Sequence, residues 1–464
     1  MSTFSGLGNA LSALNSQRLA LEVSGQNIAN ANTNGYVRQR ANLEAIGSVN
    51  AMRNGGGHGI GSGVKVTSID RLGDIFIDAR VRTTGASAAF LAARADSYTR
   101  LESTINEPSD TGLSSLMGDL WAGFQDVAKS PQTLATKQVV MDRANSVAGA
   151  LNSSYASLET QWSQHRTEVD AKVTQVNTTA TLVAKLNAEI RQREVNGNTA
   201  NELIDQRNLL ITELSALTGA TARFMPDGTA DIAIGGNLIV SGTSAQTLKL
   251  QGTTNLDAIM DGQAPVSVVW DRPGDPQVIM TGGEIAGKLS ALAPASQGGI
   301  LASAADNFNK VATALAEQVN GLLELHGEPL FQIGTGQAAK QISVAITDPS
   351  KIVSGDPALG EYDGSIADKI GQLGQALEGP SALWQTSVVS IGVAAKSAIG
   401  SYAVAEAARA SAENLQLSAT SVDVDEETVN MLAFQRGYQA ASRVLTTIDE
   451  MLDQLINRTG VVGR

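Results

Sequence analysis

The sequence predicts a mainly α fold with an inserted β domain, in which the terminal helices form a coiled-coil-like inner layer. A long helical bundle makes the middle domain, and a small β-rich domain lies outside it. Three observations predict this fold: apolar residues at helical spacing near both ends, a helical pattern over most of 87–217, and short β-type runs after residue 219. The predicted division is 1–60 and 421–464 for the inner layer, 61–219 and 289–420 for the helical middle domain, and 220–288 for the β insert.

Composition limits the function classes that the chain can serve. At 464 residues it is long enough for about three domains. The 33 Lys and Arg against 46 Asp and Glu give a formal charge of −13, which argues against a nucleic-acid partner. The sequence contains no cysteine, so disulfides, thiol nucleophiles and Cys-ligated zinc are excluded. Aromatic residues make up only 4%, so burial must rely on Leu, Val, Ile and Ala, which suits long packed helices.

The first helix is predicted from residue 7, because its apolar residues recur at helical spacing and four of them follow strict sevens. This leucine stripe consists of Leu7, Leu11, Leu14, Leu21 and Ile28. The helix is expected to end where 30–34 runs into Gly35, since Asn and Gly tolerate positive φ. The chain start lacks a basic region and an unbroken apolar run, so no conventional secretory signal is expected.

A flexible link is expected at 55–63, followed by a strand in which Val64, Val66 and Ile69 alternate with polar residues. The helical pattern of 87–217 breaks at 106–110 and near 130–131. The long segment after Pro131 has apolar residues at steps of three and four, and Asn187 occupies one of these positions. Helices return at about 300–325 and 380–418. The most apolar stretch, 388–395, is far below the roughly 18 residues that a membrane span needs, so no membrane insertion is expected.

The last helix has the clearest pattern in the chain, because its apolar residues step by three and four throughout. They are Met431, Phe434, Tyr438, Ala441, Leu445, Ile448, Leu452 and Leu455. Three acidic residues, 425–427, lie in its first turn, where negative charge is favourable. Two narrow apolar stripes at opposite ends of one chain could pair and leave surface for neighbouring copies. The competing interpretation is two ordinary surface helices docked on one core.

Both ends resemble the bacterial flagellar rod, hook and hook-associated proteins. The N-terminal segment is Gln26-Asn27-Ile28-Ala29-Asn30-Ala31-Asn32-Thr33-Asn34-Gly35-Tyr36, and the C-terminal segment runs from Ser421 through Phe434-Gln435-Arg436-Gly437-Tyr438 to Asn457. Signature residues carried over are Asn27, Ile28, Ala29, Asn30, Thr33, Gly35, Tyr36, Gln435 and Tyr438. Two internal segments, 61–76 and 201–207, resemble the hook-associated protein 1 family, which forms the first hook–filament junction. The sequence departs at Asn34, where axial proteins often have Pro, and has Gly437 inside the last helix.

This resemblance implies a structural protein of the flagellum that forms a ring between hook and filament and is required for filament assembly. It implies self-association and, as partners, the hook protein, hook-associated protein 3, a cytosolic chaperone on the C-terminal helix, and the flagellar type III export apparatus. The implied location is the secreted flagellum, after a cytoplasmic stage before export. Hook or rod protein is the alternative, with the same ends; the long helices at 134–217 count against it.

An enzyme is the rival from another class, with a site in the β insert. Asp231, Asp257, Asp261 and Asp271 supply carboxylates there, but nothing in the sequence orders them into a pair. The glycines of 55–61 lack the spacing of a phosphate loop, and His58, His165 and His326 have no paired ligand nearby. Asp423 and its acidic neighbours lack the Gly and terminal Glu of a calcium loop. No catalytic residue, cofactor or metal is therefore predicted.

Overall fold

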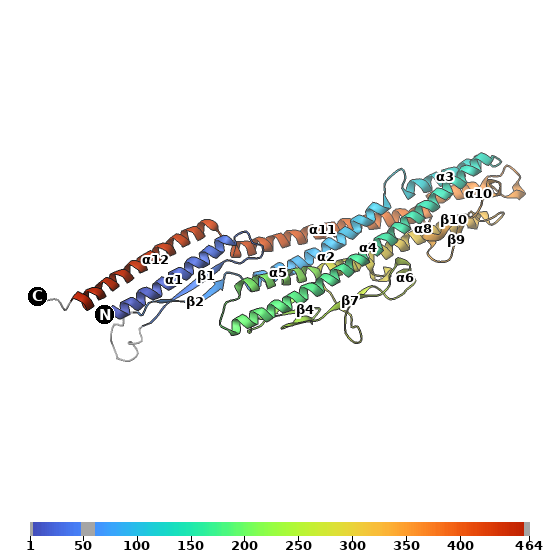
Figure 1. The fold of residues 1–464 in the computed structure, drawn as a ribbon. Coiled ribbons are helices and arrows are strands. Elements are labelled where there is room, and N and C mark those ends of the chain that lie inside the picture. The colour runs from blue at the N-terminus through green and yellow to red at the C-terminus, as the bar shows by residue number, and fades with distance from the viewer. Residues whose placement is uncertain (1–2, 48–60, 459–464) are drawn as a thin grey trace.

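The computed structural model describes residues 3–47 and 61–458, which form an elongated molecule (Figure 1). The two ends of the chain lie side by side as an antiparallel pair, α1 (Thr3–Ala29) and α12 (Val424–Asp453), and α12 ends in a π turn at Gln454–Arg458. A two-stranded antiparallel sheet, β1 (Gln39–Ala45) and β2 (Val64–Arg71), packs on α1. We call these elements the inner layer.

Strand β1 is absent from the predicted elements, because its sequence QRANLEA shows little apolar alternation. The flexible link predicted at 55–63 lies mostly outside the described residues.

The middle domain is a bundle of long helices that lie along the molecule (Figure 1). Its main helices are α2 (Ile75–Ile105), α3 (Leu113–Lys129), α4 (Leu134–Val195), α5 (Asn201–Thr218), α7 (Gly283–Leu292), α8 (Ile300–Leu323), α10 (Ser365–Gln372) and α11 (Pro380–Thr420). The hairpin of β9 (Phe331–Ile333) and β10 (Ile342–Val344) carries the short α9 (Ala338–Gln341).

Helix α2 begins twelve residues before the predicted helical region at 87. Asp74 is the N-cap, and its side chain accepts from the backbone N–H groups of Phe76 (2.7 Å) and Ile77 (3.3 Å). The predicted breaks are present: α2 ends at a left-handed Asn106 with φ 49°, and α3 ends at Lys129.

The β insert contains two small antiparallel sheets. One has the strand order β3 (Thr221–Phe224), β4 (Ala230–Ile234), β5 (Asn237–Ser241), β6 (Ser244–Ala245); the other pairs β7 (Leu248–Gln251) with β8 (Ser267–Trp270), and α6 (Leu256–Met260) lies between them in sequence. The prediction of a mainly α fold with an inserted β domain is confirmed. Helix α7 begins inside the predicted β range, because Gly283 has a φ of 84° from which the chain turns into a helix. The division into domains stays a prediction.

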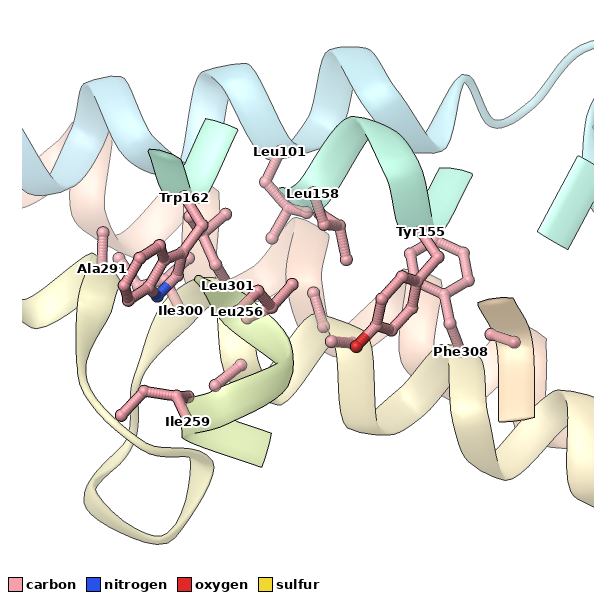
Figure 2. Close-up of a cluster of buried hydrophobic side chains, with 14 of the residues drawn as sticks. Leu101, Tyr155, Leu158, Trp162, Leu256, Ile259, Ala291, Ile300, Leu301 and Phe308 are labelled. Atoms are coloured by element: carbon pink, nitrogen blue, oxygen red, sulfur yellow. The ribbon is translucent and has the colours of Figure 1, made fainter. Parts of the chain in front are cut away.

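The hydrophobic core lies in the middle domain and the β insert. Figure 2 shows its centre, where Tyr155, Leu158 and Trp162 of α4 meet side chains from α2, α6 and α8. None of these three is measurably exposed. No described residue of α1 or α12 belongs to this core cluster. The inner layer is therefore the part of the molecule with the least apolar burial.

Two asparagines of α4 hydrogen-bond the backbone of the neighbouring β insert. Asn187 of α4 donates to the carbonyls of Ala230 (2.8 Å) and Gly242 (2.6 Å), and its oxygen accepts from the Ala230 N–H. Asn177, half-buried and nearly three turns earlier, exchanges two bonds of 2.8 Å with the backbone of Leu248. Each asparagine amide thus satisfies a backbone donor and a backbone acceptor at once, which explains why a polar residue, Asn187, occupies one position in the apolar stripe of α4.

One helical stretch within Ser365–Ile456 contains an 18-residue window with a mean hydropathy of 1.5, long and apolar enough to cross a membrane by length and composition alone. Only 11% of that window is buried. The prediction from 388–395 counted uninterrupted apolar residues, whereas the many alanines of α11 keep the mean hydropathy high.

Candidate assembly interface

Two glycines lie at the contact between α1 and α12 in their antiparallel pair. A Cβ on Gly6 would lie 3.2 Å from Cδ1 of Ile448, and a Cβ on Gly437 would lie 2.9 Å from Cδ of Gln17. The two contacts are separated by the same number of residues on both helices, so the pairing keeps one register along its length. Glycine inside α12 costs about 1 kcal/mol of helix propensity relative to Ala. The close approach of Gly437 to α1 accounts for glycine at this position.

The predicted stripe residues lie beside the contact between α1 and α12, and most of them are only partly buried. On α1, Leu11 is 51% exposed, and the other four members are half-buried. The buried positions of α1 are instead Ala10, Ser16, Ala20, Val23, Ser24 and Asn27. Of the C-terminal stripe only Ala441 is buried; Leu455, in the π turn, is 54% exposed, and the remaining six members are half-buried: Met431, Phe434, Tyr438, Leu445, Ile448 and Leu452. The single chain therefore leaves much of both apolar stripes uncovered.

A second apolar face of α12 is more open still. Val429, Leu432, Val444 and Met451 are 65%, 47%, 52% and 51% exposed. Exposed apolar area of this kind on a paired helix marks an interaction surface. The inner layer thus has apolar surface for neighbours on both sides of the helix pair.

The N-terminal signature residues form a hydrogen-bonded turn that folds β1 back onto α1. Buried Asn27 donates to the carbonyl of Gln39 (2.9 Å) and accepts from the Gln39 N–H (3.0 Å) and the Tyr36 hydroxyl (2.9 Å). The Thr33 hydroxyl donates to the Asn30 side chain at 3.2 Å. Gly35 has a φ of 80°, which other residues adopt rarely. Ile28 is half-buried, and Ala29 and Gln435 are exposed.

Small polar residues of α1 fix the start of β2. The Ser16 hydroxyl donates to the Val64 carbonyl (3.2 Å), and the Val64 N–H donates to the Ser12 hydroxyl (3.3 Å). Gly63 has a φ of 107°, and a Cβ there would lie 2.1 Å from the Ser12 oxygen. Only glycine therefore allows the sheet to approach α1 this closely.

Two ion-pair clusters lie where the inner layer meets the rest of the described chain, and we call this region the joint. In the first, Arg38 pairs with Glu426 (2.9 Å) and Glu427 (2.7 Å) at the start of α12, while its backbone N–H donates to the Thr420 carbonyl (3.0 Å). The Glu427 side chain is only 3% exposed, so it depends on this cation. Arg38 thereby links the segment that leaves α1 to the segment between α11 and α12.

The second cluster joins the sheet to α5. Asp205 accepts from Arg71 at 2.5 Å and from the Val37 N–H at 3.1 Å. Asn201, one turn earlier, donates to the Gln39 side chain (2.9 Å) and to the Ile69 carbonyl (3.0 Å). The internal segment that resembles the hook-associated proteins is thus the part of α5 that holds the inner layer.

The electrostatics of the joint follow from burial and from these pairs. Burial, with help from Asp205, Glu202 and Glu427, raises the pKa of Tyr36 to about 12, so its hydroxyl stays a donor to Asn27. Burial raises the pKa of Asp205 despite Arg71. The hydrogen bond to Glu426 raises the pKa of Arg38, and Arg38 lowers the pKa of Glu426. The Arg38 pair therefore stays charged at neutral pH.

The roles of Arg38 and Glu427 in the joint were not predicted. Residues 425–427 were expected only to favour the N-terminus of α12, and Asp423 is its N-cap, accepting from Asp425 N–H at 2.9 Å. A signal was present: a basic residue follows the first signature, and an acidic triplet opens the last helix. The first lies between α1 and β1, and the second lies where the chain re-enters the inner layer at α12.

The candidate residues for an enzyme site each have a separate structural partner. Asp231 accepts from the Gly242 N–H (2.9 Å), Asp257 from the Tyr155 hydroxyl (2.9 Å), and Asp261 from Gln337 (2.9 Å). Asp271 pairs with Lys249 at 3.3 Å. Among the described residues no group of three or more His, Cys, Asp or Glu could hold a metal. His58 lies outside the described residues.

Three family models match the chain. The flagellar hook-associated protein FlgK helical domain matches 98–326, the flagellar basal body rod FlgEFG protein C-terminal model matches 416–458, and the flagella basal body rod protein model matches 7–36. The two rod models cover the terminal helices, and the helical-domain model covers most of the bundle and the β insert. The arrangement of matches therefore follows the layers of the structure.

Relatives and one solved structure agree with these matches. Flagellar hook-associated protein 1 of Bacillus subtilis is 28% identical over 519 aligned positions, which cover 100% of both chains. The protein of that name from Escherichia coli is 27% identical over 245 positions, covering 52% of this chain and 44% of the other. The flagellar hook junction protein FlgK from Burkholderia pseudomallei has a similar fold, with a TM-score of 0.61 over 73% of this chain and 100% of the other, at 15% identity.

Proposed function

We infer that this chain, which belongs to the family of flagellar hook-associated protein 1, is a structural subunit of the bacterial flagellum that forms the junction between hook and filament. The observation that carries this function is the combination of two kinds of segment in one chain. Rod-type segments make the paired ends, and the FlgK helical domain lies between them. A hook or rod protein would share the ends, whereas the helical domain favours the junction.

The inner layer is the part through which the subunits associate. Its two helices bury little apolar surface within the chain, and both stripes stay half-buried or exposed. Neighbouring copies would cover these stripes, so each helix gains most of its burial in the assembly; the hydrophobic gain is about 25 cal/mol per Å² covered. The interaction residues proposed are the five of the α1 stripe and the eight of the α12 stripe. The chain thus self-associates into a ring or helical oligomer.

The axial partners follow from the same location. The hook protein lies below the ring and hook-associated protein 3 above it, and each presents paired terminal helices of its own type. The joint supports such an adapter role, because few polar contacts hold the inner layer to α5 of the middle domain, among them the Arg71–Asp205 ion pair and the bond from Asn201 to the Ile69 carbonyl. The subunit resides in the flagellum outside the cell and has no catalytic task.

Before assembly the chain passes through the flagellar type III export apparatus from the cytoplasm. Helix α12, with an apolar face that is open along its length, is the segment that a cytosolic chaperone covers until export. The absence of cysteine means that the unfolded chain cannot cross-link on its way to the exterior.

The test replaces Leu445 and Leu452 by Asp. The charges disrupt the apolar stripe of α12, so we expect the middle domain to fold, while assembly and chaperone binding are lost. The measurements are circular dichroism of the purified chain, co-purification of the chaperone, and complementation of a deletion strain scored by electron microscopy for hooks without filaments. The matched control is Thr446→Asp, at an exposed position of the same helix. Normal filaments on cells with the double variant would contradict the proposal.

A further inference from the structure

Three exposed valines lie on the side of α11 that points away from the helices on which it packs, with Lys396 and Gly400 between the second and the third. Val389, Val393 and Val404 are 64%, 65% and 73% exposed, and their spacing places them on one face. Ile391 and Ala395, which lie on the opposite side, are buried. We call the three exposed valines the valine ridge. A surface of this kind on a chain with a formal charge of −13 needs a partner to cover it.

A matching apolar groove lies on another part of the middle domain. It has a volume of about 440 Å³ between α4 and α5, and five leucines line it: Leu182, Leu186, Leu203, Leu209 and Leu210. Leu182 and Leu209 are 44% and 43% exposed although they are large aliphatic residues. We call this the leucine groove. Helix α2 packs against both α5 and α11, and the ridge on α11 and the groove between α4 and α5 are separate surfaces of the bundle.

The charges beside the two surfaces are complementary. Lys396 is exposed one turn after Val393 on the ridge face, and it makes no ion pair with any residue that the structure describes. Glu189 lines the leucine groove together with Lys185; the Glu189 side chain is 45% exposed, and within the described part of the chain it makes one loose ion pair, with Lys185 at 4.0 Å. A valine ridge placed in the groove can therefore bring Lys396 to Glu189.

We propose that the valine ridge of one copy packs in the leucine groove of the next copy in the junction. This inference rests on the proposed function and names the contact between middle domains. The two surfaces are different, so the contact is heterologous and repeats in the same sense from copy to copy, which closes a ring or continues a helix. The ridge is thus a lateral interface, separate from the helix pair of the inner layer.

The absence of native cysteine gives a direct test. A chain with Val393→Cys and Leu186→Cys is assembled in cells and mildly oxidised, and the isolated junctions are run on a non-reducing gel. We expect a ladder of disulfide-linked multimers. Each single variant and the pair Val393→Cys with Ser157→Cys, at an exposed position of α4 far from the groove, should give no ladder. Junctions that form without a ladder would overturn the inference.

A charge exchange tests the same contact without relying on disulfide geometry. Lys396→Glu and Glu189→Lys alone should each lower the number of filament-bearing cells about tenfold, and the two together should restore it. Equal numbers for all four chains would also overturn the inference. If the unaltered chain does not restore filaments to a deletion strain, the proposed function itself fails, and this inference with it.

A membrane is the other surface that an apolar helix could meet. Purified chain is mixed with vesicles of phosphatidylglycerol and phosphatidylethanolamine and floated on a gradient, beside the Val393→Glu variant. We expect neither chain to float. Flotation that the substitution abolishes would assign the ridge to lipid and overturn the proposed contact.

Discussion

His165 shows how one residue couples the middle domain to pH. Its side chain is fully buried on α4, one turn from Trp162, and neither ring nitrogen has a hydrogen-bond partner within the described structure. Burial, together with the nearby Lys288, lowers its pKa to about 4, although Glu168 opposes the shift. The imidazole is therefore neutral in the folded chain at neutral pH, because the one carboxylate beside it among the described residues, Glu168 at 3.8 Å from Nδ1, is already paired with Lys288 and Arg100.

We expect stability to fall as the pH drops from about 6.5 towards 4. The unfolded chain, with an ordinary histidine pKa, binds a proton in this range, whereas the folded chain does not. Between pH 7 and pH 4.5 the chain should lose about 2 to 3 kcal/mol more unfolding free energy than His165→Leu, measured by urea denaturation. His326→Asn, which keeps the buried ring, should retain the full loss. A difference below 0.5 kcal/mol between the chain and His165→Leu would contradict this prediction.

Other polar residues of the core have roles that no local pattern reveals. Asn187 was visible as a gap in an apolar stripe, but its partners, the backbones of Ala230 and Gly242, are about 40 to 55 residues away in sequence. The same holds for Asn27, whose type was noted in a signature, whereas its three hydrogen bonds depend on where β1 folds back. Sequence indicates that such a residue is unusual; only the tertiary fold supplies its partners.

At the scale of elements, Gly437 lies at the contact between α1 and α12, where the absence of a side chain lets the two helices approach. Most glycines inside helices lower stability without compensation. Gly437 instead lies against the side chain of Gln17, which would have to move to make room for a larger residue. Gly149 of α4, which has nothing within 4 Å of its Cβ position, is the matched exposed glycine.

Replacing Gly437 by Leu should separate the two helices in spite of its better helix propensity. The leucine side chain collides with α1, so we expect amide hydrogen exchange to rise in both helices and filament assembly to fall. Gly149→Leu removes the same helix penalty without a collision, so it should stabilise the middle domain by about 0.5 to 1 kcal/mol. Unchanged exchange in α1 and α12 of the Gly437 variant would show that the contact does not need glycine.

The long helices were predictable because their apolar spacing persists over many turns. The breaks near 106–110 and 130–131 were visible from Pro, Asn and Ser. Strand β1 was not visible, since its seven residues are mostly polar and depend on β2 and α1 for their pairing. The start of α2 was missed because Asp74 caps a first turn in which Ile75 and Phe76 are exposed and give no amphipathic signal. The stripes themselves were found, but their partial burial depends on a helix more than 390 residues away.

At the scale of the whole molecule, Arg38 ties the segment after α1 to the first turn of α12, beside the point where α11 ends at Thr420. Removal of its guanidinium leaves Glu427 buried and unpaired, which costs about 3 kcal/mol. We expect Arg38→Ala to loosen the joint, with faster proteolysis near residue 421 and a larger radius of gyration by small-angle X-ray scattering. Lys65→Ala breaks only an exposed pair with Glu44, 56% and 61% exposed, and should change neither measurement. Identical proteolysis of the Arg38 variant and the parent chain would sink this prediction.

The pairing of the first helix with the last also fixes the order in which the molecule can fold. Alone, a contact between the two ends would close a loop of about 400 residues, at an entropic cost of roughly 5 kcal/mol. Folding of the middle domain removes most of that cost, because α2 and α11 pack together and bring residues 75 and 420 to the same end of the bundle. The inner layer therefore forms last. Before the C-terminal segment is available, the chain has a folded bundle and two terminal segments that have not yet paired.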